Sequence, residues 1–138
     1  MDTTVIREQM LDAAYKAADR FFQDKLGGQD RYACGFAWVT VFPEHKGTTK
    51  EGKAERKILA ELGFKKDWTG KAYQYWNPSR YGCQNVDTLE EGARAAADVL
   101  KGYGFKAYAA AALGQLACAE LLVLKGYGFK AYADSRLD

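Results

Sequence analysis

The chain has few of the residues that build metal centres and disulfide frameworks. Its 138 residues include two prolines, one histidine and three cysteines, and no two cysteines form a CxxC pair. A structural zinc site needs about four Cys or His ligands at close spacing, so no metal site and no cofactor are expected. Cys34, Cys83 and Cys118 are widely spaced and odd in number, which favours buried thiols of a cytosolic protein over a disulfide framework.

Long apolar runs and blocks of like charge are missing as well. The longest apolar stretch, 107–124, contains Gln115 and Glu120 and is too short and too polar to span a bilayer. The 20 basic and 18 acidic residues are scattered and leave a formal charge of +2, whereas phosphate-binding proteins concentrate Lys and Arg. No signal-peptide pattern opens the sequence. We therefore expect a cytoplasmic protein without a membrane segment, and nucleic acid is the less favoured partner.

Apolar and aromatic residues are abundant and recur in helix-like and strand-like periods. Hydrophobic residues make up 48% of the chain and aromatic residues 14%. The length, residues 1–138, suits one globular domain. Thr48 with Glu51, and Asp87 with Glu90, have the spacing of capping boxes at helix starts. The spacing of apolar residues predicts helices at 5–26, 48–63 and 87–102, and strands at 32–42, 71–76 and 103–109.

The order of these elements predicts the fold class. An α-β-α-β-α-β order, followed by a duplicated helix–strand unit, is typical of a two-layer α/β (α+β) sandwich. In such a fold, helices pack on one small sheet, here of three or four strands.

The C-terminal part contains an internal tandem duplication. Residues 99–109 and 123–133 share the sequence VLKGYGFKAYA, which a recent tandem event or deliberate engineering would produce. Between the copies, a helix predicted at 110–124 is apolar almost all round and must be buried in this chain or against another. Because both copies fit one sheet edge, we predict a homo-oligomer that forms through helix 110–124 or by strand exchange.

The segment KGYGFKAY, at 101–108 and 125–132, nearly matches the RNA-contacting signature of RRM domains, with lysine in place of valine. On that interpretation, single-stranded nucleic acid stacks on sheet aromatics. The aromatics concerned are Tyr73, Tyr75, Tyr103 and Phe105. The alternative, which we favour, is that Gly102 ends a helix as its C-cap and the following aromatics enter a core strand.

The loop 76–85 is the stretch of sequence most typical of a binding site. It follows a predicted strand, and ligands often bind beyond strand ends in α/β sheets. Its candidate ligand-binding residues are Asn77, Ser79, Arg80, Tyr81, Gln84 and Asn85. Amide and guanidinium groups suit a small polar or anionic ligand, or a protein partner. Alternatively, the Asn and Ser side chains bond only their own turn.

Evidence for catalysis in the sequence is thin. No Walker loop, dinucleotide-binding glycine motif, GxSxG or HExxH is present. His45 and Cys83 could form a nucleophile pair if the fold brought them together. The favoured hypothesis is therefore a non-enzymatic binding protein, with single-stranded nucleic-acid binding and a small enzyme as alternatives.

Four short motifs carry a resemblance. They are GFAWV at 35–39, WNPS at 76–79, QNVD at 84–87 and SRLD at 135–138. With them the chain resembles small uncharacterised α/β proteins of tailed phages and marine metagenomes. The resemblance implies expression in the cytoplasm of a bacterial host and binding to a host protein or defence component.

Overall fold

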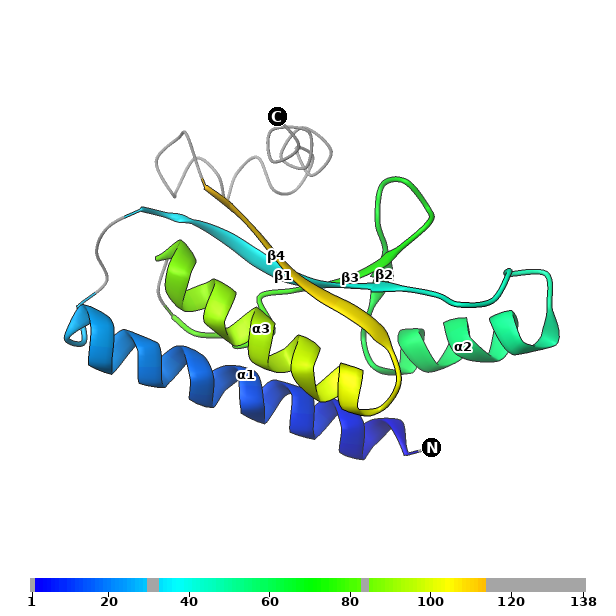
Figure 1. Ribbon diagram of the computed structural model, residues 1–138, viewed down its shortest axis with the longest axis horizontal. Coiled ribbons are helices and arrows are strands. Elements are labelled where there is room, and N and C mark those ends of the chain that lie inside the picture. Colours follow the sequence, from blue (N-terminus) through cyan, green and yellow to red (C-terminus); the bar gives the residue numbers. More distant parts are fainter. Residues whose placement is uncertain (1, 30–32, 83–84, 114–138) are drawn as a thin grey trace.

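The computed structural model describes residues 2–29, 33–82 and 85–113, which form three helices and four strands (Figure 1). The helices are α1 (Thr3–Leu26), α2 (Lys50–Glu61) and α3 (Val86–Gly102). The strands are β1 (Gly35–Phe42), β2 (Lys65–Lys66), β3 (Tyr73–Trp76) and β4 (Lys106–Leu113). Each helix and strand predicted within these residues is present. Strand β2 is additional, because two residues are too few to show an alternating pattern.

The described elements form two layers, which confirms the predicted fold class. The strands make one antiparallel sheet in the order β2-β3-β1-β4, and the helices lie on one face of it (Figure 1). Helix α3 packs on β1 and β4, and α1 packs along α3. The described part of the chain is therefore an α+β sandwich with a four-stranded sheet.

The core lies between the sheet and the two long helices. Alternate side chains of β1, at Ala37, Val39 and Val41, belong to one buried cluster with Met10 of α1 and Leu100 of α3. Because successive residues of a strand point to opposite faces, the intervening residues of β1 point away from the helices.

Helices α1 and α3 approach closely at Gly92. A Cβ atom at this position would lie 2.6 Å from Cβ of Ser79 and 3.1 Å from the carbonyl oxygen of Ala14. The first distance is shorter than any ordinary carbon–carbon contact, so glycine is the residue that fits here. Gly92 thereby lets the loop after β3 lie between α1 and α3.

The first copy of KGYGFKAY connects α3 to β4, as predicted, but a different glycine makes the turn. Helix α3 includes Gly102, and Gly104 has the positive φ of 95°. The N–H of Gly104 donates to Lys101 O (3.0 Å), and the N–H of Phe105 donates to Leu100 O (3.1 Å). These two bonds define a Schellman motif. The assignment of the cap to Gly102 was wrong, because the packing of Phe105 against the core decides which glycine turns.

Helix α2 ends with the same motif, which places β2. Gly63 has a φ of 98° and donates to Ala60 O (3.0 Å), and Phe64 donates to Leu59 O (3.0 Å). Phe64 is buried directly after the turn, as the phenylalanine after α3 is partly buried. The chain then enters the edge strand β2.

Both predicted helix starts were wrong by one or two residues. Thr49 rather than Thr48 caps α2, and its hydroxyl accepts a 3.0 Å hydrogen bond from the N–H three residues ahead. Asn85 rather than Asp87 caps α3, and its Oδ1 accepts 2.8 Å and 3.0 Å bonds from the N–H and hydroxyl of Thr88. Asp87 lies in the first turn instead, where the helix dipole favours a negative charge.

The helix predicted at 110–124 is contradicted at its start. Residues 110–113 belong to β4, which pairs with β1 from Lys106 to Leu113. Cross-strand pairing overrides the helix preference of the alanines at this point. The remainder of that helix, and the second copy at 123–133, lie outside the described residues. Self-association through this region stays a prediction.

Cys34 is disulfide-bonded, which contradicts the expected free thiols. The other two cysteines lie outside the described residues. Because disulfides persist mainly in oxidising compartments, the cysteine pattern no longer supports the predicted cytoplasmic location. Among the described residues, no helix combines the length and apolar character that crossing a bilayer requires.

Candidate ligand-binding site

The turn after β3, where ligand-binding residues were predicted, bonds largely to itself. The hydroxyl of Ser79 donates to Oδ1 of Asn77 (3.0 Å) and accepts from the N–H of Tyr81 (3.2 Å). Ser79 has no exposed surface. Asn77 and Arg80 have positive φ values of 45° and 54°, and Arg80 N–H donates to Asn77 O (3.0 Å). Of these residues, Arg80 is the one with an exposed side chain.

Tyr81 fastens the same loop to α1. Its hydroxyl donates to Oδ1 of Asp19 (2.7 Å), and its ring centroid lies 5.5 Å from that of Tyr15 and 5.2 Å from that of Phe22. Burial, together with the Asp19 carboxylate, raises the pKa of Tyr81 to about 12. Asn85 is the buried cap of α3, and Gln84 lies outside the described residues.

The four aromatics proposed for nucleic acid do not share one exposed surface. Tyr73 is 7% exposed and belongs to the core, and Phe105 packs against that core. Tyr103 lies at the end of α3 and donates its hydroxyl to Gln9 of α1. Tyr75 is half-buried and contacts Phe64, with ring centroids 5.5 Å apart.

The aromatics on the face of the sheet away from the helices are the intervening ones. Trp38 and Trp76 stack at 4.5 Å, and Phe36 lies edge-on to Trp76 at 5.9 Å. Phe42 and Tyr108 meet edge-on at 5.8 Å and are 45% and 52% exposed. On β3, Trp76 lies one residue after the predicted Tyr75 and therefore on the opposite face of the sheet.

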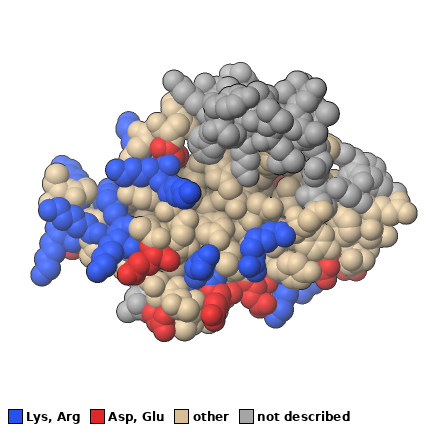
Figure 2. Space-filling view, turned by 180° about the vertical axis from the view of Figure 1, so that it is seen from behind, with Lys and Arg blue, Asp and Glu red and all other residues tan. Residues whose placement is uncertain are grey.

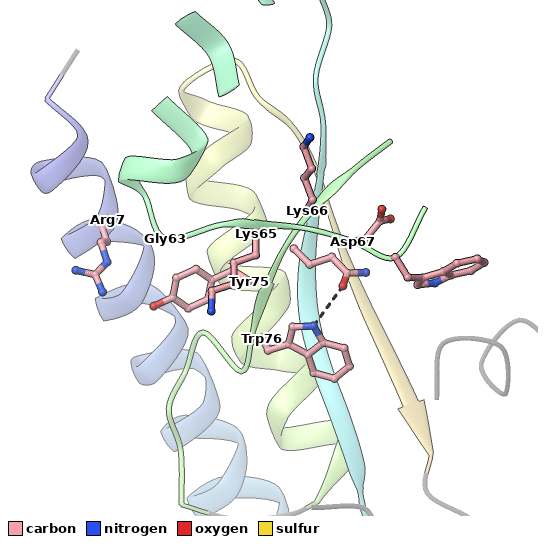
Figure 3. A pocket seen from close by; sticks show the side chains of 9 residues that line it. Arg7, Gly63, Lys65, Lys66, Asp67, Tyr75 and Trp76 are labelled. Atoms are coloured by element: carbon pink, nitrogen blue, oxygen red, sulfur yellow. Dashed lines mark hydrogen bonds between the residues drawn. The ribbon is translucent and has the colours of Figure 1, made fainter. Parts of the chain in front are cut away.

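An open pocket lies where α1, the end of α2 and the β2–β3 hairpin meet. Its volume is about 590 Å³ (Figure 3). It is lined by Arg7, Gly63, Lys65, Lys66, Asp67, Trp68, Gln74, Tyr75 and Trp76. We call it the α1–β3 pocket. Figure 3 shows Arg7 on α1 and Tyr75 on β3, with Gly63 between these two elements in the view.

Gly63 shapes the upper wall of the α1–β3 pocket. A Cβ atom there would lie 2.9 Å from Cε2 of Tyr75 and 3.8 Å from Nε of Arg7. Its positive φ and this close approach both require glycine. The tyrosine ring and the guanidinium group therefore both lie next to the C-terminal turn of α2.

The pocket is rich in positive charge without matching negative charge. Within the described residues, Arg7, Lys65 and Lys66 form no ion pair. Asp67 is the acidic residue of the lining, and its Oδ1 accepts bonds from the N–H groups of residues 69 and 70 and from the Thr69 hydroxyl (2.6–3.0 Å). Its carboxylate thus stabilises the hairpin turn, and this turn presents Trp68, which is 42% exposed.

The pocket belongs to a basic end of the molecule (Figure 2). Residues 46–71 carry eight Lys or Arg and four Asp or Glu, a net charge of +4, whereas the whole chain has +2. The basic residues are Lys46, Lys50, Lys53, Arg56, Lys57, Lys65, Lys66 and Lys71. This concentration contains no long run of like charge, but a charge count over a 26-residue window reveals it in the sequence.

Arg80 lines a second hollow next to the first. This hollow has a volume of about 550 Å³ and includes Arg7, Glu8, Asp12 and Tyr15 of α1. Arg7 lines both hollows. One of the predicted ligand-binding residues therefore lies beside the α1–β3 pocket, although the prediction did not include α1.

The catalytic alternative has no assembled site among the described residues. His45 is half-exposed, and its Nδ1 lies 3.6 Å from Oε1 of Glu55. Cys83 lies outside the described residues. Over residues 2–29, 33–82 and 85–113, no three His, Cys, Asp or Glu side chains are grouped so as to hold a metal ion.

The chain matches no protein-family model, no curated protein and no solved structure.

Proposed function

We propose that the protein is a binding protein whose α1–β3 pocket takes a ligand with a phosphate-type anion and a flat ring, as in a nucleotide. The observation that carries the proposal is a pocket lined by Arg7, Lys65 and Lys66, without ion-pair partners among the described residues, and by the aromatic residues Trp68 and Tyr75. A pocket with unpaired cations and aromatic rings favours a ligand that has both an anionic group and a flat ring.

Each part of such a ligand has a matching group. The guanidinium of Arg7 can donate two parallel hydrogen bonds to a phosphate, and Lys65 can add a point charge. The indole of Trp68, a residue that is 42% exposed, provides an aromatic ring with which a base can stack. The pocket volume of about 590 Å³ falls within the range of roughly 300–1,000 Å³ usual for small-ligand sites.

The same chemistry has a second source, the nucleotide unit of a single strand. The net charge of +4 over residues 46–71 favours it, because a strand leaving the pocket would pass further cations. A free nucleotide engages the pocket alone. The two sources differ in their salt dependence, since a strand releases more counterions than a single phosphate group does.

Titration of the purified chain tests the proposal. Tryptophan fluorescence is followed while adenosine monophosphate, or a 12-nucleotide oligouridylate, is added at two salt concentrations. A free-nucleotide site predicts similar affinity for both ligands and a shallow salt dependence. A strand site predicts much tighter oligonucleotide binding that weakens steeply with salt. Saturable binding of neither ligand at millimolar concentration would refute the proposal.

A matched pair of arginine variants locates the site. Arg7→Ala removes a charge-assisted pair of hydrogen bonds and should weaken binding about 10- to 100-fold. Arg20→Ala is the control, because Arg20 is also exposed on α1 and does not line the pocket. Equal affinity of the two variants would place the binding elsewhere. Both changes are at exposed positions, and neither should alter the melting temperature.

Binding of a protein partner, which the phage resemblance implies, stays a prediction. Capture of a protein by wild-type chain, but not by the Arg80→Ala variant, would support that alternative.

A further inference from the structure

The position of β4 beside β1 limits which side chains fit on each face of the strand. Ala107 is fully buried, and Ala109 and Ala111 pack against the core on the helix side. Lys106 and Tyr108 are exposed on the other side. We call this place, defined by the pairing of β1 with residues 106–113, the β4 seat. It requires small residues at the helix-facing positions and accepts large ones at 106 and 108 on the other face, where Ala112 is 7% exposed.

The second copy of the duplication meets the helix-facing requirement in the same register. Residues 106–113 have the sequence KAYAAAAL and residues 130–137 have KAYADSRL, with five of eight positions identical. Placed in the seat, the second segment would direct Ala131, Ala133 and Ser135 toward the helices. Asp134 would take the place of the partly buried Ala110 on the opposite face, and Arg136 that of Ala112 near the end of the strand. Every helix-facing position thus keeps a small side chain.

The two segments differ in how well their patterns specify a strand register. Residues 109–112 are four consecutive alanines, which prefer helix to strand and do not distinguish one register from the next. The stretch ADSR alternates small and polar residues, which pins the register of a strand with one buried face. The first segment therefore holds its strand through tertiary pairing against its own propensity.

The second copy can replace the first only at the end of α3 and in β4. At the period of the duplication, Leu116 corresponds to Gly92 and Glu120 to Ala96. Gly92 has no room for a Cβ, and Ala96 has no exposed surface, so residues 110–122 cannot take the place of the first part of α3. From Val99 onward the copies are identical, and there either one fits.

The turn after α3 can release the intervening residues. Gly102 and Gly104 have no atom within 4 Å of a Cβ built on them, so this turn faces open space. The entropy cost of a longer loop rises only with the logarithm of its length. A tether of some 24 residues keeps the second segment at about millimolar effective concentration, above that of a second chain in dilute solution.

We propose that the β4 seat binds residues 130–137 of the same chain in competition with residues 106–113, so that one fold has two alternative edge strands. This inference does not depend on the proposed ligand site.

Aspartate substitutions at equivalent positions test the proposal. Ala107→Asp bars the first segment from the seat, because a charge would be buried against the core, and Ala131→Asp bars the second segment. If both segments fit, each single variant keeps a cooperative melt within about 5 °C of the parent, and the double variant loses it. If Ala107→Asp, or Ala131→Asp, unfolds as fully as the double variant, the proposal fails.

Hydrogen exchange and light scattering identify the occupant. In the Ala107→Asp variant, amide protection should move from residues 106–113 to residues 130–137, whose peptides differ in sequence. Protection absent from 130–137 would overturn the proposal. The folded variant should be monomeric at low micromolar concentration. Folding that occurs only in a dimer would show that the strand comes from a second chain, which also contradicts binding within one chain.

Discussion

Replacement of Gly92 by alanine tests the packing that brings α1, α3 and the loop after β3 together. In an isolated helix this change would be favourable, because alanine has a helix propensity about 1 kcal/mol better than glycine. Here the added methyl group would lie 2.6 Å from Cβ of Ser79 and 3.1 Å from the backbone oxygen of Ala14. Neither atom is the free end of a side chain, so the loop or a helix must move.

The expected size of the effect follows from these opposing contributions. Overpacking of a tight contact costs about 1–3 kcal/mol, and helix propensity returns about 1 kcal/mol. We expect Gly92→Ala to lower the free energy of unfolding by roughly 1 kcal/mol, and the melting temperature by about 3–5 °C for a chain of this size.

Two further variants make the measurement decisive. Gly102→Ala is the control, because it lies on the same helix with no atom within 4 Å of its built Cβ, and it should be neutral or stabilising. Ser79→Gly removes the opposing Cβ, so it should relieve the cost when combined with Gly92→Ala. Thermal melts of the wild type, the Gly92→Ala and Ser79→Gly variants and the double variant form a double-mutant cycle. We expect a favourable coupling of about 1 kcal/mol. If Gly92→Ala raises the melting temperature as Gly102→Ala does, the close approach is not present.

Two other predictions concern the loop that fastens to both helices. The pKa of Tyr81 in the folded protein, about 12, lies above its usual value of 10.0, so its contribution to the free energy of unfolding is complete below pH 10 and is lost as the pH rises from 10 to 12. Tyr81→Phe should therefore make the free energy of unfolding, measured by denaturant melts, less dependent on pH over that interval. An unchanged slope would contradict the contact with Asp19. Asn85→Ala should lower the free energy of unfolding by about 1–2 kcal/mol, because it removes the hydrogen bonds to Thr88. Asp87→Ala should lower it by less than about 0.5 kcal/mol. If chemical denaturation gives the reverse order, Asp87 is the helix cap after all.

Local patterns in the sequence predicted most of the fold. The helix of α1 follows from apolar spacings that end at Gly27, and β1 follows from a β-branched and aromatic run that ends at Pro43. Errors occurred where two neighbouring residues satisfy one local rule equally well. Thr48 and Thr49 can both cap a helix, as Gly102 and Gly104 can both end one, and packing farther along the chain decides between them.

The candidate site was largely hidden from the sequence. The predicted loop supplied Arg80, but its Ser79 and Asn85 turned out to be buried structural groups. The α1–β3 pocket combines Arg7 with residues 63–68 and 74–76, which no local pattern associates. Its cations became notable only when their lack of ion-pair partners among the described residues could be seen.

The sequence by itself determined the three helices, β1, β3 and the start of β4, their order and the class of fold, because hydrophobic period and turn chemistry act over a few residues. Tertiary structure alone decided the strand order, the glycine that turns after α3, the strand state of residues 110–113 and the assembly of the pocket. These features depend on contacts between residues far apart in the chain. For residues 109–112 such contacts outweigh the local preference of alanine for helix.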